Sequence, residues 1–236
     1  MGAIFIAGIG PGSENHITPA VFCCLEEADI ILGYRTYLNL VSQIAPHIPR
    51  ESSGMRQEVQ RARRALELAR DGKRVCLVSS GDAGIYGMAG VVLELAADGK
   101  IDDIPIEVLP GISALNAAAA LLGAPLMNDF ATVSLSDYLT PLDEILNRVS
   151  LAVQAGFVLC LYNPRSHSRH EPFNRTCEIL IQNCNPKTPV GIVKAATRPN
   201  QQVLLACLED CFQEAQSNEI VFVVDTFVFS LHFQRL

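Results

Sequence analysis

The sequence has few basic residues and no long apolar run, and each absence excludes a class of protein. Lys and Arg number 18 against 25 Asp and Glu, which gives a formal net charge of -7. This is the wrong sign for a protein whose main task is to grip a nucleic-acid backbone. No uncharged apolar run approaches the ~18 residues of a membrane span. We therefore expect no nucleic acid and no membrane among the partners.

The sequence also lacks a secretory signal and a cysteine motif. The apolar opening at residues 3–7 is too short for a signal segment and no basic stretch precedes it, so a cytoplasmic chain is expected. The 8 cysteines include no Cys-x-x-Cys pair and lie mostly in apolar segments, which predicts reduced core thiols. His167 and His170 have no third ligand at a recognisable spacing, so no metal site is predicted.

Covalent catalysis has little support in the sequence. No Gly-x-Ser-x-Gly elbow is present, and no cysteine stands in a basic, exposed setting that would lower its pKa. The chemistry must therefore come from another kind of site.

Short β-branched runs alternate with helical stretches along all 236 residues, which predicts an α/β fold with mainly parallel or mixed sheets. The predicted strands are residues 3–8, 29–32, 74–79, 105–109, 131–135, 157–161, 189–193, 203–206 and 220–224. Gly123-Ala124-Pro125 ends a small-residue helix that begins at Ser113. We expect two α/β domains, 1–125 and 126–236, divided at this break.

Two helix signals stand out in the first half. Thr18 before Pro19 is typical of an N-cap followed by a first-turn proline. A second helix runs from near Arg56 to Asp71-Gly72, with one apolar stripe at Val59, Ala62, Leu66 and Ala69. Its arginines are predicted to lie mostly outside that stripe on a solvated face, with substrate steering as the alternative; they are Arg56, Arg61, Arg63, Arg64 and Arg70.

A glycine-rich turn follows the first predicted strand, as Gly-Ile-Gly-Pro-Gly-Ser at 8–13. A phosphate-binding loop needs consecutive N–H donors and a lysine, whereas Pro11 removes a donor and no lysine follows. A dinucleotide fingerprint needs glycine where Ser13 stands, and Asp29 precedes its strand instead of closing it. NAD binding is therefore disfavoured, and a tight ligand-bordering turn is expected.

Two more glycine turns follow later strands. Residues 79–88 read Ser-Ser-Gly-Asp-Ala-Gly-Ile-Tyr-Gly-Met, and residues 110–114 read Pro-Gly-Ile-Ser-Ala. Asp82 either accepts hydrogen bonds from a ligand or caps the helix that follows. Turns at the carboxyl ends of three parallel strands line one rim, where ligands of open α/β sheets bind.

The second half offers a basic loop and a proton-transfer candidate. Residues 162–170 carry Arg165 and Arg169, whose guanidinium groups suit a carboxylate-rich ligand. Asp137 stands just after a predicted strand, either as a proton-transfer group or as the cap of a helix that begins near Pro141.

Five motifs in order resemble the tetrapyrrole methyltransferases: the turn at 8–13 with Ile17-Thr18-Pro19, Ala28-Asp29 before a strand into Gly33-Tyr34, the segment 80–89, the segment 110–114, and Tyr162-Asn163-Pro164-Arg165-Ser166. The resemblance covers roughly residues 3–205. Within this superfamily, segments 121–130 and 134–137 favour the members that methylate C17 of precorrin-3B or cobalt-factor III in cobalamin biosynthesis, with ring contraction.

The resemblance implies two α/β domains with a cofactor cleft between them, S-adenosylmethionine as cofactor, a tetrapyrrole substrate and a homodimer. The cofactor-binding residues it implies are Pro11, Gly81, Asp82, Ala83, Ile85, Gly87, Ser113, Ala114, Tyr162, Asn163, Ala195, Ala196 and Thr197. The substrate-binding residues are Gly10, Pro11, Gly12, Arg165 and Arg169.

Methyl transfer suits such a site because the protein mainly has to align an electron-rich carbon with the methyl group in a dry cleft. A fixed counter-charge would stabilise the sulfonium ground state more than the transition state, so glycine turns and backbone carbonyls are well matched to the task. Ring contraction needs proton transfer, for which Asp137 and His16 are the catalytic candidates.

The end of the sequence departs from the family pattern. Relatives usually close with a strand and a Gly-Asn-Ser/Thr turn, whereas residues 225–236 contain no glycine. A further strand, a dimer surface or an altered pocket all fit this segment. This departure keeps a non-catalytic module that binds S-adenosylmethionine open as an alternative. Methylation of another corrin carbon and the choice between metal-free and cobalt-containing substrate also stay open.

Overall fold

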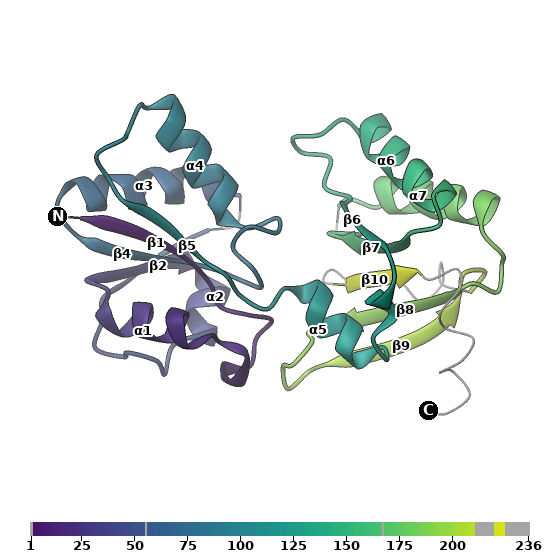
Figure 1. Cartoon of the computed structure of the whole chain (residues 1–236), viewed down its shortest axis with the longest axis horizontal. Coiled ribbons are helices and arrows are strands. Elements are labelled where there is room, and N and C mark those ends of the chain that lie inside the picture. The colour runs from purple at the N-terminus through teal and green to yellow at the C-terminus, as the bar shows by residue number, and fades with distance from the viewer. Residues whose placement is uncertain (1, 55, 167, 211–219, 225–236) are drawn as a thin grey trace. The chain divides into compact units, whose positions relative to one another are not determined.

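The computed structural model describes residues 2–54, 56–166, 168–210 and 220–224 (Figure 1). The chain forms two compact units, Met1–Ala114 and Leu115–Leu236, and each contains one sheet covered by helices. Across the described ranges, no helix has the length and apolar character needed to cross a membrane.

The first unit is built on a five-stranded parallel sheet with the strand order β3-β2-β4-β1-β5. The strands are β1 (Ala3–Gly8), β2 (Ile30–Tyr34), β3 (Arg50–Ser53), β4 (Arg74–Ser79) and β5 (Ile106–Leu109). The connecting elements are η1 (Glu14–His16), α1 (Pro19–Glu27), α2 (Arg35–Leu40), α3 (Glu58–Arg70) and α4 (Met88–Asp98). Parallel neighbours require crossover connections, which these helices supply.

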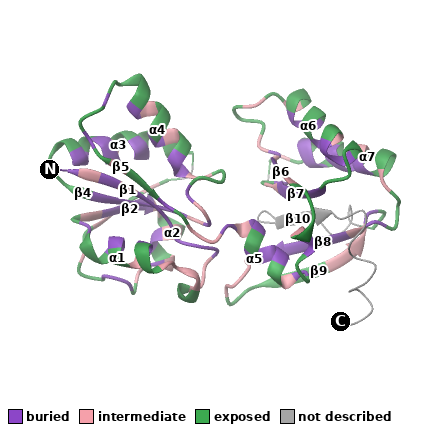
Figure 2. Cartoon of the chain, in the orientation of Figure 1, coloured by how far each residue is buried: buried purple, intermediate pink, exposed green. Residues whose placement is uncertain are grey.

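Helices cover both faces of this sheet. Ile4 and Ile6 of β1 point into the core under α3 and α4, whereas Ala7 and Ile9 belong to the core under α1 and α2. Figure 2 shows the central strands β1, β2 and β4 as mostly buried, whereas the edge strands β3 and β5 are not. Thr18 accepts a hydrogen bond from the amide of Val21 at 3.4 Å, which confirms the predicted N-cap of α1.

The second unit contains a mixed sheet with the order β6-β7-β10-β8-β9. Its strands are β6 (Phe130–Ser134), β7 (Val158–Tyr162), β8 (Pro189–Lys194), β9 (Gln202–Cys207) and β10 (Ile220–Val224), with α5 (Ala114–Leu121), η2 (Pro125–Met127), α6 (Leu142–Gln154) and α7 (Glu171–Asn183) around them. β6 and β7 are parallel, and β10 is antiparallel to β7 and β8. β8 therefore runs in the direction of β7, so β6, β7 and β8 end at the same edge.

The division between the units falls after Ala114, whereas the sequence placed it after residue 125. The reason is the packing of α5: Leu115, Ala118 and Leu122 form a core with Val158 of β7 and Val193 of β8. A Cβ added at Gly191 would stand only 2.5 Å from Leu122 Cδ1, so the Leu122 side chain fills the space beside this glycine. The small-residue helix thus packs on the second sheet.

The α/β fold class is confirmed, and the predicted strands correspond to β1, β2 and β4 to β10. β3 was not predicted because Arg50-Glu51-Ser52-Ser53 has no apolar residue, and it forms at the sheet edge. The prediction for α3 was partly wrong. Arg61 is only 5% exposed and lies on the buried face, whereas Val59 is 48% exposed.

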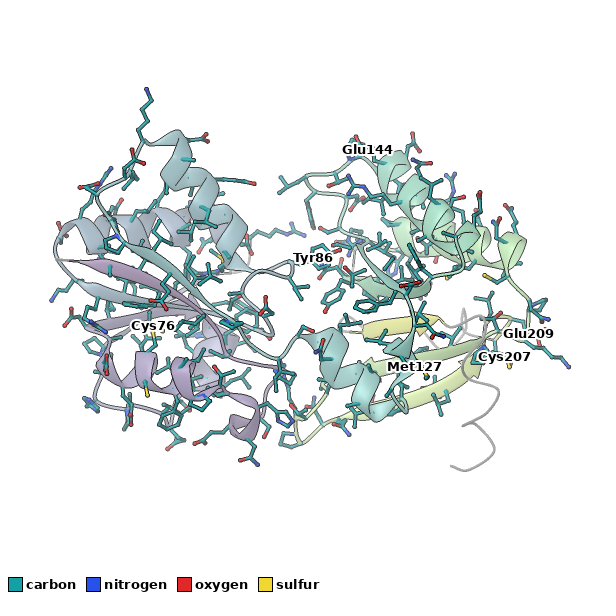
Figure 3. All side chains as sticks on the ribbon, viewed as in Figure 1. Cys76, Tyr86, Met127, Glu144, Cys207 and Glu209 are labelled. Atoms are coloured by element: carbon teal, nitrogen blue, oxygen red, sulfur yellow. The ribbon has the colours of Figure 1, made fainter. Side chains whose placement is uncertain are left out.

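The cysteines that the structure describes form no disulfide, and Cys24, Cys76, Cys160 and Cys177 are buried. Figure 3 shows Cys76 within the first unit, where it stands on β4. Burial raises the pKa of the Cys160 thiol. These cysteines act as small core side chains, as the sequence predicts.

Candidate functional site

Three glycine turns meet through their backbones at the carboxyl edge of the first sheet. Gly10 and Gly81 exchange two hydrogen bonds, of 3.1 and 2.8 Å, and join the turn after β1 to the turn after β4. A Cβ added at Gly111 would stand 2.3 Å from the carbonyl oxygens of both Gly8 and Gly81. Only glycine fits at this crossing, because any side chain there would separate the three turns.

The carboxylate of Asp82 holds the turn after β4 in shape. One oxygen accepts hydrogen bonds from the amides of Gly84 (2.8 Å) and Ile85 (3.2 Å), and the other accepts one from Gly111 (2.9 Å). Asp82 does not cap a helix, because α4 begins at Met88 with Gly87 as its N-cap. The carboxylate therefore serves the protein's own turns, and the capping alternative is wrong.

The loop 81–87 exposes only its tip. Ile85 is 38% exposed and Tyr86 is 51% exposed, and Tyr86 has a positive φ of 52° (Figure 3). Ala83 is fully buried, and its carbonyl oxygen accepts a hydrogen bond from Ala89 at 3.0 Å. Among the predicted cofactor residues of this loop, Ile85 is accessible, whereas Ala83 stabilises the start of α4.

The remaining predicted residues of the first unit lie on the same rim. Pro11 is buried in the turn after β1, and Ser113 is 4% exposed in the turn that leads into Ala114. His16 is the last residue of η1, and its carbonyl oxygen would lie 2.8 Å from a Cβ added at Gly10. Within the described part of the chain, the buried Nδ1 of His16 has no hydrogen-bond partner. This nitrogen is one of the few polar groups of the rim left to act on something else.

The second unit gathers its predicted residues where β6 and β7 end. The hydroxyl of Tyr162 accepts a hydrogen bond from the amide of Leu115 at 2.9 Å, so the ring lies against the start of α5. Asn163, with a φ of 52°, donates from Nδ2 to Ser134 Oγ at 3.0 Å. This bond joins the ends of the two parallel strands.

Arg169 stabilises the same edge from the following loop. Its guanidinium donates to the carbonyl oxygens of Leu135 and Asn163, and its Nε lies 3.8 Å from Asp137 Oδ1. Its side chain is 12% exposed, while that of Asp137 is 34% exposed. Arg169 therefore acts as an internal clamp in this structure, and Asp137 is the more accessible member of the pair.

Arg165 is likewise engaged within the second unit. It donates to Asn174 Oδ1 at 2.7 Å and stacks 4.6 Å above the ring of Phe173. Asp137 does not cap α6, because the N-cap of that helix is Pro141. His170 is the N-cap residue of α7, whereas His167 lies outside the described residues.

The turn after β8 carries Ala195, Ala196 and Thr197 at the edge where β7 also ends. Ala195 and Thr197 have positive φ values of 51° and 66°, and the amide of Thr197 donates to Gln201 Oε1 at 2.7 Å. The predicted residues thus form two groups, one on the carboxyl edge of each sheet.

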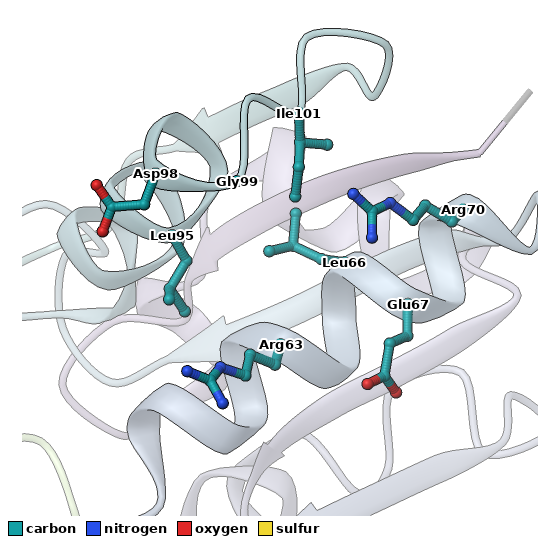
Figure 4. A pocket seen from close by; sticks show the side chains of 8 residues that line it. All are labelled: Arg63, Leu66, Glu67, Arg70, Leu95, Asp98, Gly99 and Ile101. Atoms are coloured by element: carbon teal, nitrogen blue, oxygen red, sulfur yellow. The ribbon is translucent and has the colours of Figure 1, made fainter.

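A shallow depression of about 440 Å³ lies between α3 and α4 (Figure 4). Its lining residues are Arg63, Leu66, Glu67, Arg70, Leu95, Asp98, Gly99 and Ile101. Most of these residues belong to the second half of α3, to the last turn of α4 or to the segment just after it, before the chain enters β4 and β5, so the depression lies toward the amino ends of the strands. It is separate from the glycine turns, and two acidic side chains offset its two arginines.

Sequence reasoning overlooked the burial of Arg61, which contacts Met88 just after the loop 81–87. The predicted apolar stripe includes the neighbouring Ala62, which was the available signal, but the positive charge of Arg61 predicted exposure. Among the described residues, no cluster of His, Cys, Asp and Glu could hold a metal ion. The departure at residues 225–236 lies outside the described residues, while the predicted strand before it is β10.

Comparison with known proteins agrees with this geometry. Residues 3–211 match the family of tetrapyrrole (corrin/porphyrin) methylases. A probable cobalt-factor III C(17)-methyltransferase of Salmonella typhimurium is 44% identical over 219 residues, which are 92% of this chain and 90% of that protein. The cobalt-factor III methyltransferase of Priestia megaterium is also 44% identical, but the match, 89% of this chain, spans only 39% of that longer protein.

Among solved structures, the methyltransferase CobJ has a TM-score of 0.90 and 39% sequence identity, with 96% of this chain and 95% of that chain covered. The family match spans both units and includes all three glycine turns, the end of β7 and the turn after β8. The chain belongs to the tetrapyrrole (corrin/porphyrin) methylases.

Proposed function

We propose that this chain transfers a methyl group from S-adenosylmethionine to C17 of precorrin-3B or cobalt-factor III, with ring contraction, in cobalamin biosynthesis. The observation that carries the proposal is the backbone junction of Gly8, Gly81 and Gly111 at the edge of a parallel sheet. The relatives named as cobalt-factor III methyltransferases support the choice of substrate.

The residues of the first rim fit S-adenosylmethionine. Glycine turns without side chains let a ligand approach the backbone closely, and residues 84–86 are exposed at the tip of the loop. When bound, this cofactor supplies an electrophilic methyl group on a sulfonium. The carboxylate of Asp82 is already shared among three amides, so it presents little free negative charge that would stabilise the sulfonium ground state.

The second rim contributes the remaining proposed contacts. Tyr162, Asn163 and the turn 195–197 are proposed to border the adenine. The side chains of Tyr162 and Asn163 are held by their hydrogen bonds with Leu115 and Ser134, and the backbone of Thr197 is held by its bond to Gln201. Positioning of this kind supplies most of what a displacement at a methyl carbon needs.

Ring contraction needs groups that move protons. His16 has a buried Nδ1 without a partner among the described residues, and it borders the turn 10–12 that is proposed to contact the tetrapyrrole. Asp137 is exposed on the second unit, beside the clamp formed by Arg169. We propose these two side chains as the proton-transfer groups. Arg165 and Arg169 are proposed to act near substrate carboxylates through their positive charge.

The cofactor is tested by calorimetric titration with S-adenosylhomocysteine, with NADH as the comparison ligand. Saturable binding of one S-adenosylhomocysteine per chain and no binding of NADH are expected. NADH is not expected to bind, because Asp29 lies at the amino end of β2 and cannot serve a dinucleotide ribose. Binding of NADH alone would overturn the cofactor assignment.

The reaction is tested anaerobically with precorrin-3B and cobalt-factor III in parallel, and the product is located by mass spectrometry and ¹³C-methyl NMR. A methyl group at C17 in a contracted ring is expected from at least one acceptor. Methylation at another carbon would correct the position. Cofactor binding without product from either acceptor would favour a non-catalytic binding module.

A homodimer and a cytoplasmic location complete the proposal. The homodimer rests on the resemblance to the family and is tested by light scattering coupled to size-exclusion chromatography. A mass of twice 25.6 kDa is expected, and a monomer over the working concentration range would contradict it.

A further inference from the structure

An arginine is buried beside the start of α4, where the loop 81–87 ends. Arg61 of α3 is 5% exposed, and no carboxylate among the described residues forms an ion pair with it. Burial lowers the pKa of Arg61, although Glu58 partly offsets this effect through space. A buried cation held by neutral groups alone is uncommon, so its contacts call for an explanation.

The guanidinium bridges two parts of the first unit. Its Nε donates to Ser53 Oγ at 2.6 Å and its Nη2 to the carbonyl oxygen of Gly54 at 3.0 Å, at the carboxyl end of β3. Its Nη1 contacts Met88 Sδ at 3.4 Å. Arg61 therefore joins the turn between β3 and α3 to the first residue of α4.

Met88 is also the point at which the loop 81–87 closes on itself. Its amide donates to Ser79 Oγ at 3.4 Å, and the next amide, of Ala89, donates to the carbonyl oxygen of Ala83. A Cβ at Gly87 would stand 2.5 Å from that same carbonyl oxygen. A displacement of Met88 would therefore be passed directly to Gly87 and Ala83.

The two ends of the loop are thus fixed by different groups. Asp82 ties its beginning to Gly111, and Arg61 holds its end at Met88. Only a planar guanidinium reaches an oxygen of Ser53, a carbonyl of Gly54 and the sulfur of Met88 at once, since a lysine ammonium at the same place is a single point charge.

We propose that Arg61 is a positioning residue for the cofactor loop: it holds Met88, and through it residues 81–87, in the conformation that binds S-adenosylmethionine. This inference rests on the proposed function. It predicts that the charge and shape of a side chain that does not touch the cofactor control the affinity for it.

The test compares Arg61→Met and Arg61→Lys with Arg50→Met. Arg50 offers a matched control, because it also holds a turn of the same unit, by donating to the carbonyl oxygens of Val41, Ile44 and Ala45, and it has no contact with the loop. The dissociation constant of S-adenosylhomocysteine is measured by calorimetry and the melting temperature by circular dichroism.

Arg61→Met is expected to weaken S-adenosylhomocysteine binding about tenfold, and Arg61→Lys by less, while Arg50→Met lowers the melting temperature and leaves the affinity within about twofold. In turnover, KM for S-adenosylmethionine rises and kcat at saturating cofactor is retained. Equal affinity in wild type and Arg61→Met would overturn the inference while leaving the proposed function intact. A wild-type chain that binds no S-adenosylhomocysteine would instead refute the proposed function.

A second comparison covers the case in which Arg61→Met does not fold. Met88→Leu keeps the volume of the side chain and removes the sulfur acceptor, so it is expected to weaken binding by a few-fold. Arg61→Lys should then have a smaller effect in the Met88→Leu background than in the wild type. Independent, multiplying effects would show that Arg61 does not act through Met88 and would overturn the inference.

Discussion

The carboxylate of Asp82 accepts a hydrogen bond from the amide of Gly111 at 2.9 Å and so ties the turn after β4 to the turn after β5. These turns are 29 residues apart in the chain, and the strand between them in the sheet is β1, whose own turn crosses both. The rim of the first unit is therefore one connected backbone structure.

Asp82→Asn is expected to weaken both this connection and the binding of S-adenosylhomocysteine. An amide group replaces one acceptor oxygen by a donor, so a backbone amide loses its partner, at a cost of about 1–3 kcal/mol in the free energy of unfolding. The affinity for S-adenosylhomocysteine should fall about tenfold because the loop 81–87 loses its fixed shape. Chemical denaturation and calorimetry measure the two effects.

Asp29→Asn is the matched control for that variant. Asp29 accepts a hydrogen bond from the amide of Arg74 at 2.8 Å, at the amino edge of the same sheet. Its loss should lower stability and leave the affinity for S-adenosylhomocysteine unchanged. An equal loss of affinity in both variants would mean that Asp82 acts only through overall stability.

Gly111→Ala is expected to disrupt the rim, because the new Cβ would stand 2.3 Å from two carbonyl oxygens. Backbone must move to relieve this contact, and we expect a loss of more than about 3 kcal/mol in the free energy of unfolding or no soluble folded protein. Gly90→Ala is the control: nothing lies within 4 Å of a Cβ there, and the position is helical. It should be neutral or stabilise by about 1 kcal/mol. Similar urea midpoints for the two variants would contradict the crossing of the turns.

The glycine turns were predictable because their glycines directly follow the predicted strands in the sequence. The same reasoning left the role of Asp82 open, since its partner Gly111 is distant in sequence and nothing local to residue 82 points to it. The sequence also predicted that ligand-binding turns share one edge, because parallel strands end together.

Other features depend on tertiary contacts that no local pattern encodes. β3 is a polar edge strand, and its only sign is the pairing with β2 in the sheet. Arg61 was assigned to a solvated face because charge usually indicates exposure, and its burial follows from acceptors supplied by Ser53, Gly54 and Met88. The packing of α5 on the second sheet likewise depends on Val158 and Val193, which are distant from this helix in the sequence.

Asp137→Asn is expected to lower turnover at least about 100-fold and to leave the dissociation constant of S-adenosylhomocysteine unchanged, because it removes a proposed proton-transfer group and no cofactor contact. The clamp of Arg169 on the carbonyl oxygens of Leu135 and Asn163 does not involve the carboxylate, so the fold of the edge is retained. Asp143→Asn, in the first turn of α6, is the control and should turn over normally. Wild-type turnover in Asp137→Asn would remove this residue from the mechanism.

The thiols of Cys24 and Cys76 give a pH-dependent prediction. The pKa of Cys24 is lowered, chiefly by a hydrogen bond from the Cys76 thiol and also by the cation of Arg74, against the opposing effect of burial. The same hydrogen bond, together with complete burial, raises the pKa of Cys76. Alkylation by iodoacetamide requires the thiolate, so Cys24 should become reactive at a lower pH than a cysteine with an ordinary pKa.

Cys76→Ala removes that hydrogen bond and leaves burial as the main influence, so the pKa of Cys24 rises and the midpoint of its alkylation moves to higher pH. Cys76→Ser keeps a hydroxyl donor and should retain most of the lowered midpoint. Mass spectrometry of native protein alkylated at a series of pH values measures this, with the exposed neighbour Cys23 as an internal reference for the amount of reagent. An unchanged midpoint for Cys24 in Cys76→Ala would show that Arg74, and not the Cys76 thiol, controls its ionisation. The alkylation midpoint of Cys24 would then rise in the Arg74→Met variant instead.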